Sequence, residues 1–395
     1  MQRLLREESR SREGERRMML RRLKPEEHPD TRQLWEEIFC EDTKEFLDYY
    51  YFIKARSNEI YVAEEDGRIC SMLHLNPYVM RIEEDEFPSD YIVAVATREA
   101  YRGRGYMGEL LRRTMKEMHG RGVPFTFLMP AAEAIYTPYD FRFIYQQETG
   151  MVETGGRPEE PDPDVTSMDA HLWDADALSA FFTQNFSGRW QVCTKRDEEY
   201  FRTMILEQQS ERGGVRILKK GERMIGTFAY AEEDGLEIRE PLILPGCEEV
   251  FESAVRRLAS SGEDAVKVYG YSGGVQRAQR PLIMARILSL PTLLGAMKVP
   301  SGLAVDCSFA VIDPLIRQNS RIWRVQSLCG EEKISVRESE DSEGVIPIAE
   351  LTELLFGVRT VEEIRGAEHV IITDHLAEEL EKIIKLKRVF INEVV

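Results

Sequence analysis

Apolar positions in the first part of the chain switch between strand-like and helix-like spacing. Segments 59–65 and 68–80 have the patterns of strands, and the Asp-Gly dipeptide between them favours a tight hairpin turn. Residues 91–97, YIVAVAT, form an unbroken apolar run of strand length, which predicts a central strand buried on both faces. From 107 to 118, apolar residues recur at helical spacing and predict an amphipathic helix that ends near Gly120.

A further buried strand is predicted at 124–130, which completes a strand–turn–helix–strand unit. Beyond a segment rich in Gly, Pro and acids at 150–165, the layout recurs, because the strand pair at 215–230 parallels the pair at 60–75. Residues from 302 onward alternate in strand fashion and close with two helices. This last pattern is typical of α+β domains.

These patterns predict a mixed α/β chain of the α+β class with three folded parts. We place these parts at 18–150, 151–283 and 284–395. Residues 1–17 contain six arginines and little apolar content, so we expect a disordered leader, or an upstream start codon with Met18 or Met19 as the usual beginning.

Composition narrows the classes of partner. The formal net charge of −18 argues against general nucleic-acid binding and favours a cationic acceptor. The six cysteines are dispersed without any C-x-x-C pair, and the six histidines are scattered, so we expect no metal site and a reducing, cytoplasmic location. No apolar run reaches the ~18 residues that would span a bilayer, so we expect no membrane association.

The stretch AYRGRGYMGELL, residues 100–111, lies between the central strand and the amphipathic helix. Gly103 and Gly105 suit a turn in which backbone N–H groups approach an anion at a helix N-terminus, and Arg102 and Arg104 add positive charge. An ordinary charged turn is the alternative. The spacing fits neither a dinucleotide fingerprint nor a nucleotide-triphosphate loop, and the second copy lacks the turn, which assigns its chemistry to the first part.

The segment VATREAYRGRGYMGELL resembles the coenzyme A pyrophosphate loop of the GNAT (GCN5-related) N-acetyltransferases, whose pattern is R/Q-x-x-G-x-G/A. Arg102 and Gly105 match its first and fourth positions. Met107 departs from the usual small residue, as in the Eis (enhanced intracellular survival) acetyltransferases. The resemblance implies tandem GNAT folds, the second degenerate, and a C-terminal sterol-carrier-protein-like α+β domain. The segment PLIMARILSLPTLL at 281–294 is similar to the start of that last domain.

The same resemblance implies where acetyl-CoA binds. Strand residues would offer backbone groups to the pantetheine arm, although 95–97 could also be ordinary buried strand. The turn would bind the pyrophosphate. The implied cofactor-binding residues are Val95, Ala96, Thr97, Arg102, Gly103, Arg104, Gly105, Tyr106, Met107 and Gly108.

Two catalytic groups are also implied. The segment IYTPYDF resembles the Eis-like I-Y-x-x-F/Y-x-Y/F pattern, whose tyrosine, here Tyr136, protonates the coenzyme A sulfur. We expect Tyr139 and Tyr145 to be core aromatics. Eis-like enzymes use the terminal α-carboxylate as base, which here belongs to Val395 at the end of the apolar tail VFINEVV. The alternative for this tail is a final strand that merely packs on its domain.

Two functions from different classes follow. The first is an acetyl-CoA-dependent N-acetyltransferase acting on amines of a small cationic acceptor, such as an aminoglycoside, or on a lysine side chain. The resemblance also implies a homo-oligomer, a hexamer. The second is a lipid- or small-molecule-binding protein in which the GNAT parts are a non-catalytic scaffold.

Overall fold

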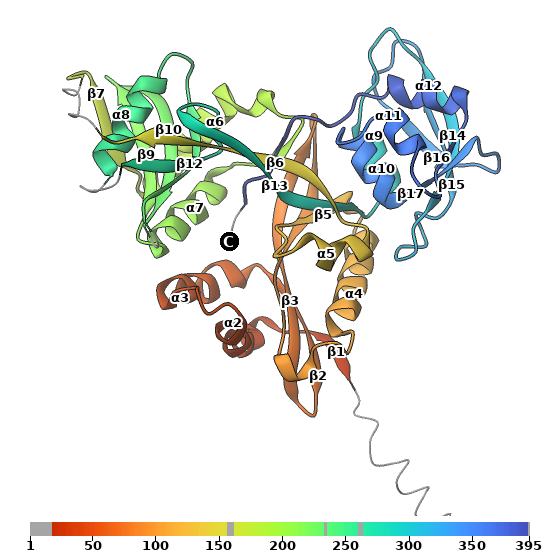
Figure 1. Cartoon of the computed structure of the whole chain (residues 1–395), viewed down its shortest axis with the longest axis horizontal. Coiled ribbons are helices and arrows are strands. Elements are labelled where there is room, and N and C mark those ends of the chain that lie inside the picture. Colours follow the sequence, from red (N-terminus) through yellow and green to blue (C-terminus); the bar gives the residue numbers. More distant parts are fainter. Residues whose placement is uncertain (1–17, 156–161, 233–234, 260–263, 394–395) are drawn as a thin grey trace, which may run out of the picture.

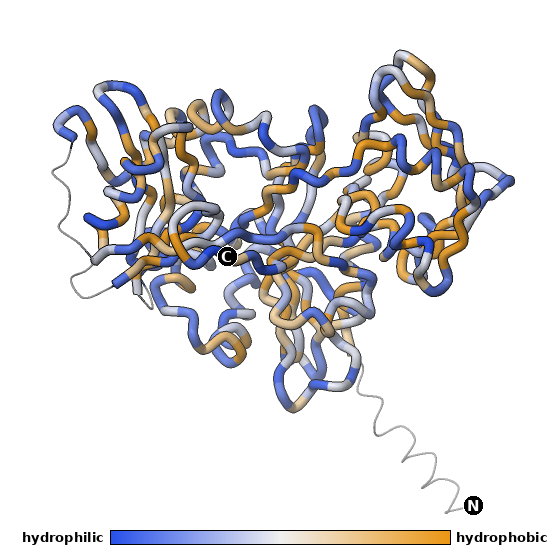
Figure 2. Tube along the Cα trace, turned by 45° about the horizontal axis from the view of Figure 1, so that its top comes forward, coloured by the Kyte–Doolittle hydropathy of each residue, from blue (hydrophilic) through white to orange (hydrophobic). Residues whose placement is uncertain are grey.

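The computed structural model of the chain describes residues 18–155, 162–232, 235–259 and 264–393. The expected leader at 1–17 and the terminal residue Val395 lie outside the described residues. Helices and strands both contribute substantially, so the mixed α/β fold predicted from the sequence is confirmed (Figure 1). Hydrophobic and hydrophilic stretches alternate along the trace, and several outer loops are hydrophilic (Figure 2). No helix in the described ranges is long and apolar enough to cross a membrane.

The first part of the main sheet is built by strands that pair in chain order. Ile60 and Val62 face one side of the sheet, where they pack with α2 and α3, while Tyr61 and Ala63 face the other side and pack with α4. This strict alternation is what a strand buried on both faces requires. The elements are β1 (Met19–Arg22), α2 (Arg32–Ile38), α3 (Lys44–Phe52), β2 (Glu59–Glu65), β3 (Arg68–Ile82), β4 (Asp85–Thr97), α4 (Tyr106–Gly120) and β5 (Phe125–Leu128).

Two long strands join the first part to the second. β13 (Val275–Ile287) inserts between β5 and β6 (Arg142–Glu153), and the far half of β6 continues into the second part by pairing with β12 (Ala265–Tyr269). Among the described residues, the first and second parts thus share one sheet of 14 strands. The domain boundaries expected at 150 and 283 fall inside these shared strands, and the domain division itself stays a prediction.

The second part repeats the strand and helix pattern that its sequence predicted. Beyond β12 the sheet continues in the order β11, β10, β9 and β7, and α7 crosses toward the first part (Figure 1). The elements are β7 (Val165–Asp169), α6 (Ala175–Asn185), β8 (Val192–Thr194), α7 (Glu198–Ser210), β9 (Gly214–Lys220), β10 (Arg223–Ala231), β11 (Glu237–Ile243) and α8 (Glu248–Leu258).

The third part is a separate lobe with a five-stranded sheet in the order β16-β15-β14-β17-β18 (Figure 1). Its core is continuous with that of the first part. Its elements are α9 (Leu290–Ala296), β14 (Val305–Ile312), β15 (Ile322–Ser327), β16 (Ser335–Glu338), β17 (Gly344–Pro347), α10 (Ile348–Leu355), α11 (Val361–Arg365), β18 (Ile371–Ile372) and α12 (Asp374–Lys382).

A fully buried arginine anchors this lobe to the first part. The Arg286 guanidinium donates to the backbone carbonyls of Tyr139 (2.9 Å) and Ile287 (2.8 Å) and pairs with the Asp313 carboxylate at 2.6 Å. Asp313, also buried, accepts from the backbone N–H of Ile316 at 2.8 Å. These partners satisfy both buried charges, as a buried ion pair requires.

After α12 the chain returns to the other two parts. β19 (Val389–Phe390) runs parallel to β8, and β8 pairs in turn with the far end of β3. The Phe390 ring stacks on Trp190 at a centroid distance of 4.2 Å. The described residues of the tail are thereby held between the first and second parts. Figure 1 shows the chain returning from the third part to this place.

Candidate active site

The sheet of the first part opens where β4 and β5 separate. These parallel strands pair at Tyr91 and Phe127, and within the described residues β4 then continues alone on that side to Thr97. Ala94 has a φ of +50°, and the register against β3 shifts beside it, so β4 carries a bulge at this point. The result is an open strand edge with unpaired backbone groups beside the bulge.

The residues predicted for the pantetheine arm divide between the two edges of β4. Ser71 Oγ donates to the Ala96 carbonyl at 2.8 Å, so the backbone of Ala96 faces β3. Because neighbouring residues of a strand direct their backbone groups to opposite edges, those of Val95 and Thr97 face the open side. Arg102 Nε donates to the Thr97 carbonyl at 3.3 Å and folds the start of the glycine turn against this edge.

The glycine turn forms a cradle at the start of α4. Gly103 and Gly105 have φ values of +76° and +85°, and no atom beyond their chain neighbours lies within 4 Å of where a Cβ would stand. Both are exposed, and Gly105 is the N-cap residue of α4. Left-handed glycines at the exposed N-terminus of a helix direct N–H groups and the positive end of the helix dipole toward an anion.

The side chains around the turn have structural partners. Arg104 pairs with Glu65 at 3.3 Å and lies over the Tyr101 ring at 4.7 Å. The buried Tyr106 hydroxyl donates to the same Glu65 carboxylate. Met107 packs against the core. The Tyr106 hydroxyl is therefore engaged within the protein, and the Met107 side chain is partly buried.

At position 108 a glycine is required for a separate, steric reason. A Cβ at this position would lie 2.4 Å from the Tyr139 hydroxyl, which occupies the space above the first turn of α4. The Arg112 guanidinium lies 5.7 Å from the centre of the Tyr139 ring. Tyr139 thus lies beside the cradle as a half-buried aromatic.

Tyr136 ends the short helix α5 (Glu133–Tyr136), which follows β5 directly. Its side chain is buried and meets Phe141 edge-on at a centroid distance of 6.0 Å. Burial raises the pKa of Tyr136 to about 12, so its phenol keeps its proton and can act as a hydrogen-bond donor. Burial and the nearby Tyr78 and Tyr136 hydroxyls also raise the pKa of Tyr91, which places Tyr91 in the neighbourhood of both.

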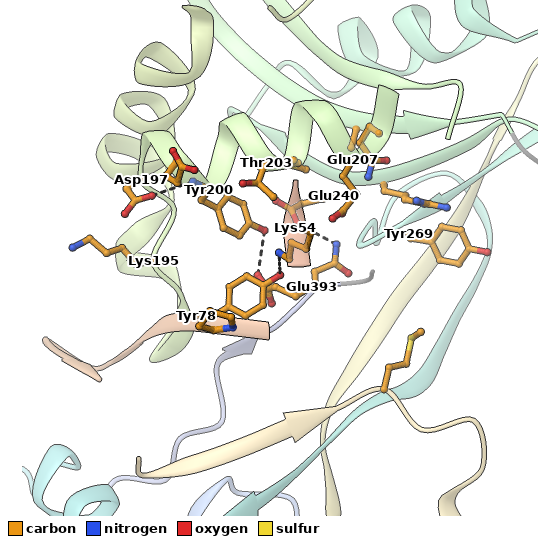
Figure 3. A pocket seen from close by; sticks show the side chains of 18 of the residues that line it. Lys54, Tyr78, Lys195, Asp197, Tyr200, Thr203, Glu207, Glu240, Tyr269 and Glu393 are labelled. Atoms are coloured by element: carbon orange, nitrogen blue, oxygen red, sulfur yellow. Dashed lines mark hydrogen bonds between the residues drawn. The ribbon is translucent and has the colours of Figure 1, made fainter. Parts of the chain in front are cut away.

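A cavity of about 470 Å³ lies between the first and second parts (Figure 3). It is lined by Lys54, by Tyr78 on β3, by Met129 after β5, and by α7, β11 and the C-terminal tail. Six carboxylates face four cationic side chains across it, so the lining is acidic when all of them are ionised. The carboxylates belong to Asp197, Glu199, Glu207, Glu237, Glu240 and Glu393.

The cavity adjoins the open edge of β4. The ring centroids of Tyr78 and Phe127 lie 6.2 Å apart, and Phe127 stacks on Tyr91 at a centroid distance of 5.3 Å. Tyr91 and Phe127 are the position at which β4 and β5 pair. Met129 lines the cavity just beyond the end of β5. The cavity and the cradle therefore lie on the two sides of the point where the strands separate.

Two groups on the cavity wall have altered acidity. Burial raises the pKa of Glu207 to about 7, against the attraction of Lys54 and the hydrogen bond that the Tyr49 hydroxyl donates at 3.2 Å. Burial lowers the pKa of Lys54, although Glu207 and Glu393 favour its charged form. Lys54 Nζ donates to the Tyr78 hydroxyl at 2.9 Å.

The C-terminal tail supplies part of the lining. Glu393 accepts from the Tyr200 hydroxyl at 3.1 Å and lies 3.6 Å from the buried Arg196 guanidinium. Asn392 donates to Glu240 at 3.1 Å and accepts from Gln147 at 2.7 Å. The last described residues of the chain are thus fixed in the cavity wall, while Val395 lies outside the described residues.

The sequence pattern located the cradle and Tyr136 but gave no signal for most of the cavity. Glu207, Glu237 and Glu240 come from the second part, which the sequence assigned no chemistry. Among the described residues, no group of His, Cys, Asp and Glu side chains could hold a metal ion.

Two family models match parts of the chain. Residues 19–144 match the family model of the acetyltransferase (GNAT) domain, and residues 290–392 match that of the sterol carrier protein domain. A comparison of the sequence with curated proteins finds no match.

Solved structures share the fold over nearly the whole chain. One is a conserved protein of unknown function from Enterococcus faecalis V583, described as a probable N-acyltransferase (TM-score 0.81, 16% identity, 96% of this chain and 100% of that one). Another is a GCN5-related N-acetyltransferase from Anabaena variabilis (0.78, 15%, 96% and 100%). A third is Eis1 from Mycobacterium abscessus (0.69, 14%, 96% and 100%). At these identities the likeness concerns the fold.

The chain therefore contains a GNAT acetyltransferase domain, and the protein is an enzyme of the N-acetyltransferase class. A sterol carrier protein domain completes it at the C-terminal side.

Proposed function

We propose that the protein transfers the acetyl group of acetyl-CoA directly to a primary amine, carried either by a small cationic molecule of the aminoglycoside type or by a lysine side chain. The observation that carries this proposal is the position of the acidic cavity beside the point where β4 and β5 separate. A thioester laid along the open edge of β4 would present its acetyl group toward the cavity, where carboxylates attract a cationic amine.

The cradle would hold the pyrophosphate of acetyl-CoA. Gly103 and Gly105 leave open space at the N-terminus of α4, where the backbone N–H groups of the turn from Gly103 to Gly108 would donate to the diphosphate. The open-edge backbone groups of Val95 and Thr97 would pair with the amides of the pantetheine arm, as a neighbouring strand would. Arg102, exposed at the mouth of the turn, adds positive charge for the diphosphate.

Tyr136 is the general acid of the proposed reaction. When the amine attacks the thioester carbonyl, the departing coenzyme A thiolate needs a proton. A buried phenol with a pKa of about 12 remains protonated at neutral pH and can donate to that thiolate. Tyr136 lies on α5, the helix that follows β5, and β5 is the strand that borders the open edge.

The carboxylate of Val395 is the base in this proposal. Support comes from the tail, since Asn392 and Glu393 are fixed in the cavity wall. Two residues of chain extend at most about 7 Å, a reach that suits a group acting within the same cavity. Desolvation would raise the pKa of a terminal carboxylate and make it a better proton acceptor.

The test measures coenzyme A release by the full chain with acetyl-CoA and a panel of polyamines, aminoglycosides and lysine peptides. We expect turnover of a cationic amine and a fall in kcat of about 10²-fold in Tyr136→Phe, with acetyl-CoA affinity by calorimetry unchanged. Tyr230→Phe is the matched control, because it removes a hydroxyl bonded to Asp169 away from the cavity.

Absence of both acetyl-CoA binding and turnover would remove the enzymatic proposal and leave the binding-protein alternative. Wild-type turnover in Tyr136→Phe would remove the role of that residue alone. The homohexameric state and the cytoplasmic location stay predictions, which light scattering and cell fractionation would test.

A further inference from the structure

Lys54 extends into the cavity from the single turn that follows α3. Its amine donates to the Tyr78 hydroxyl at 2.9 Å and lies 4.7 Å from the centre of the Tyr78 ring. Figure 3 shows it among Tyr78, Glu240 and Glu393, in the space that an acceptor would occupy. The chain therefore carries a primary amine of its own inside the cavity proposed for acceptor amines.

The amine of Lys54 differs from that of the other lysine on the cavity wall. Burial lowers the pKa of Lys54, which increases the fraction of neutral, nucleophilic amine at a given pH. Lys195 is exposed, and its ion pair with Glu86 at 2.8 Å raises its pKa. Lys195 is thus held as an ammonium ion outside the enclosed part of the cavity.

Contacts through Tyr78 connect Lys54 to the point where β4 and β5 separate. Its partner Tyr78 packs on Phe127, and Phe127 stacks on Tyr91, where β4 and β5 last pair. A lysine side chain has four rotatable bonds, so release from Tyr78 lets the amine sweep through the neighbouring space without backbone movement.

We propose that Lys54 is a substrate of the enzyme's own acetyl transfer when no acceptor amine is bound. This inference rests on the proposed function. The neutral Nζ attacks the thioester carbonyl of acetyl-CoA, a C–N bond forms, and the C–S bond breaks. The proton lost by the amine passes to a cavity carboxylate, and the coenzyme A thiolate takes a proton from Tyr136. The carboxyl then releases its proton to solvent and the Tyr136 phenolate takes one up, so the net products are an acetylated Lys54 and free coenzyme A.

Acetylation changes the cavity itself. The amide carries no charge, so Glu207 and Glu393 lose the cation that faces them. The added acetyl group also fills space beside Tyr78. An enzyme modified in this way therefore turns over added amines more slowly than the unmodified enzyme.

The test incubates the full chain with acetyl-CoA and no amine, and maps acetyl-lysine by intact-mass and peptide mass spectrometry. We expect one acetyl group per chain, on Lys54. This acetyl group should be absent from Lys54→Arg and from Tyr136→Phe when each variant is prepared and treated in the same way as the wild type. Lys385 is an internal control: burial lowers its pKa to about 8, but its amine donates to the Leu380 and Ile383 carbonyls at 2.6 and 2.8 Å, away from the cavity.

Acetylation of Lys385 or surface lysines to the same extent as Lys54, or equal labelling in Tyr136→Phe, would mean non-enzymatic chemistry and overturn the inference. An enzyme that turns over an added amine but leaves Lys54 unmodified would overturn it while the proposed function stands. An enzyme that neither binds acetyl-CoA nor releases coenzyme A would overturn both. Pre-incubation with acetyl-CoA should lower the wild-type rate with an added amine at least about threefold and leave the rate of Lys54→Arg unchanged relative to its own untreated sample.

Discussion

Replacing Glu207 with Gln should make the protein more stable at alkaline pH. Glu207 is 8% exposed, and burial raises its pKa to about 7 from the ordinary 4.5. The folded state therefore keeps this proton at pH values where the unfolded chain has lost it. The stability that comes from the neutral carboxyl is fully present below about pH 4.5 and is lost as pH rises toward 7.

The magnitude follows from the two pKa values. Their difference of about 2.5 corresponds to about 3 kcal/mol, at about 1.4 kcal/mol per pKa unit. Gln imitates the neutral form and still accepts the hydrogen bond that Tyr49 donates to Glu207 at 3.2 Å. Glu207→Gln should therefore match the wild type near pH 4.5 and exceed its free energy of unfolding by up to about 3 kcal/mol above pH 7.5.

Urea denaturation of both proteins at several pH values between 4.5 and 8.5 measures this difference. Asp90, whose pKa burial raises to about 6, is common to both proteins and cancels in the comparison. Glu199→Gln is the matched control, because Glu199 is exposed on the same helix and lines the same cavity. If the gap between Glu207→Gln and the wild type does not widen with pH, or if the control shows the same gap, the burial argument for Glu207 is wrong.

Three further outcomes test other contacts. Gly108→Ala should weaken acetyl-CoA binding about tenfold by calorimetry, because the added Cβ would lie 2.4 Å from the Tyr139 hydroxyl. Adding Tyr139→Phe should restore most of the affinity, and no recovery would point to another cause. Arg286→Met should lower the free energy of unfolding by about 3–5 kcal/mol, because it strands the buried Asp313 carboxylate, and an unchanged denaturation midpoint would contradict this. Residues appended after Val395 should lower kcat at least about 10²-fold with an unchanged melting temperature, and an active extended chain would exclude the terminal carboxylate as base.

Local patterns were enough for the cradle. The apolar run at 91–97 predicted the end of β4, and helical spacing from 107 predicted α4, whose observed end at Gly120 agrees. Both signals depend on short-range physics, namely side-chain periodicity and the left-handed conformation that Gly103 and Gly105 adopt between the two elements. The mixed α/β class could be predicted from the sequence for the same reason.

The bulge at Ala94 and the strand exchange had no local signal. Alanine rarely adopts a positive φ, and the pairing of β4 on one edge only, beside the separation from β5, is what creates this conformation. Similarly, the apolar segment of β13 could have paired within its own part. Its insertion between β5 and β6 depends on contacts between residues more than a hundred positions apart.

Taken by itself, the sequence determined the elements, the glycine turn before α4 and the tyrosine after β5, because each is specified by neighbouring residues. The tertiary structure alone decided that Lys54, Glu207 and Glu393 meet in one cavity. It also decided their acidity, since burial moves a pKa only when distant segments fold together and exclude water. Burial thereby lowers the pKa of an ordinary lysine and raises that of an ordinary glutamate to about 7.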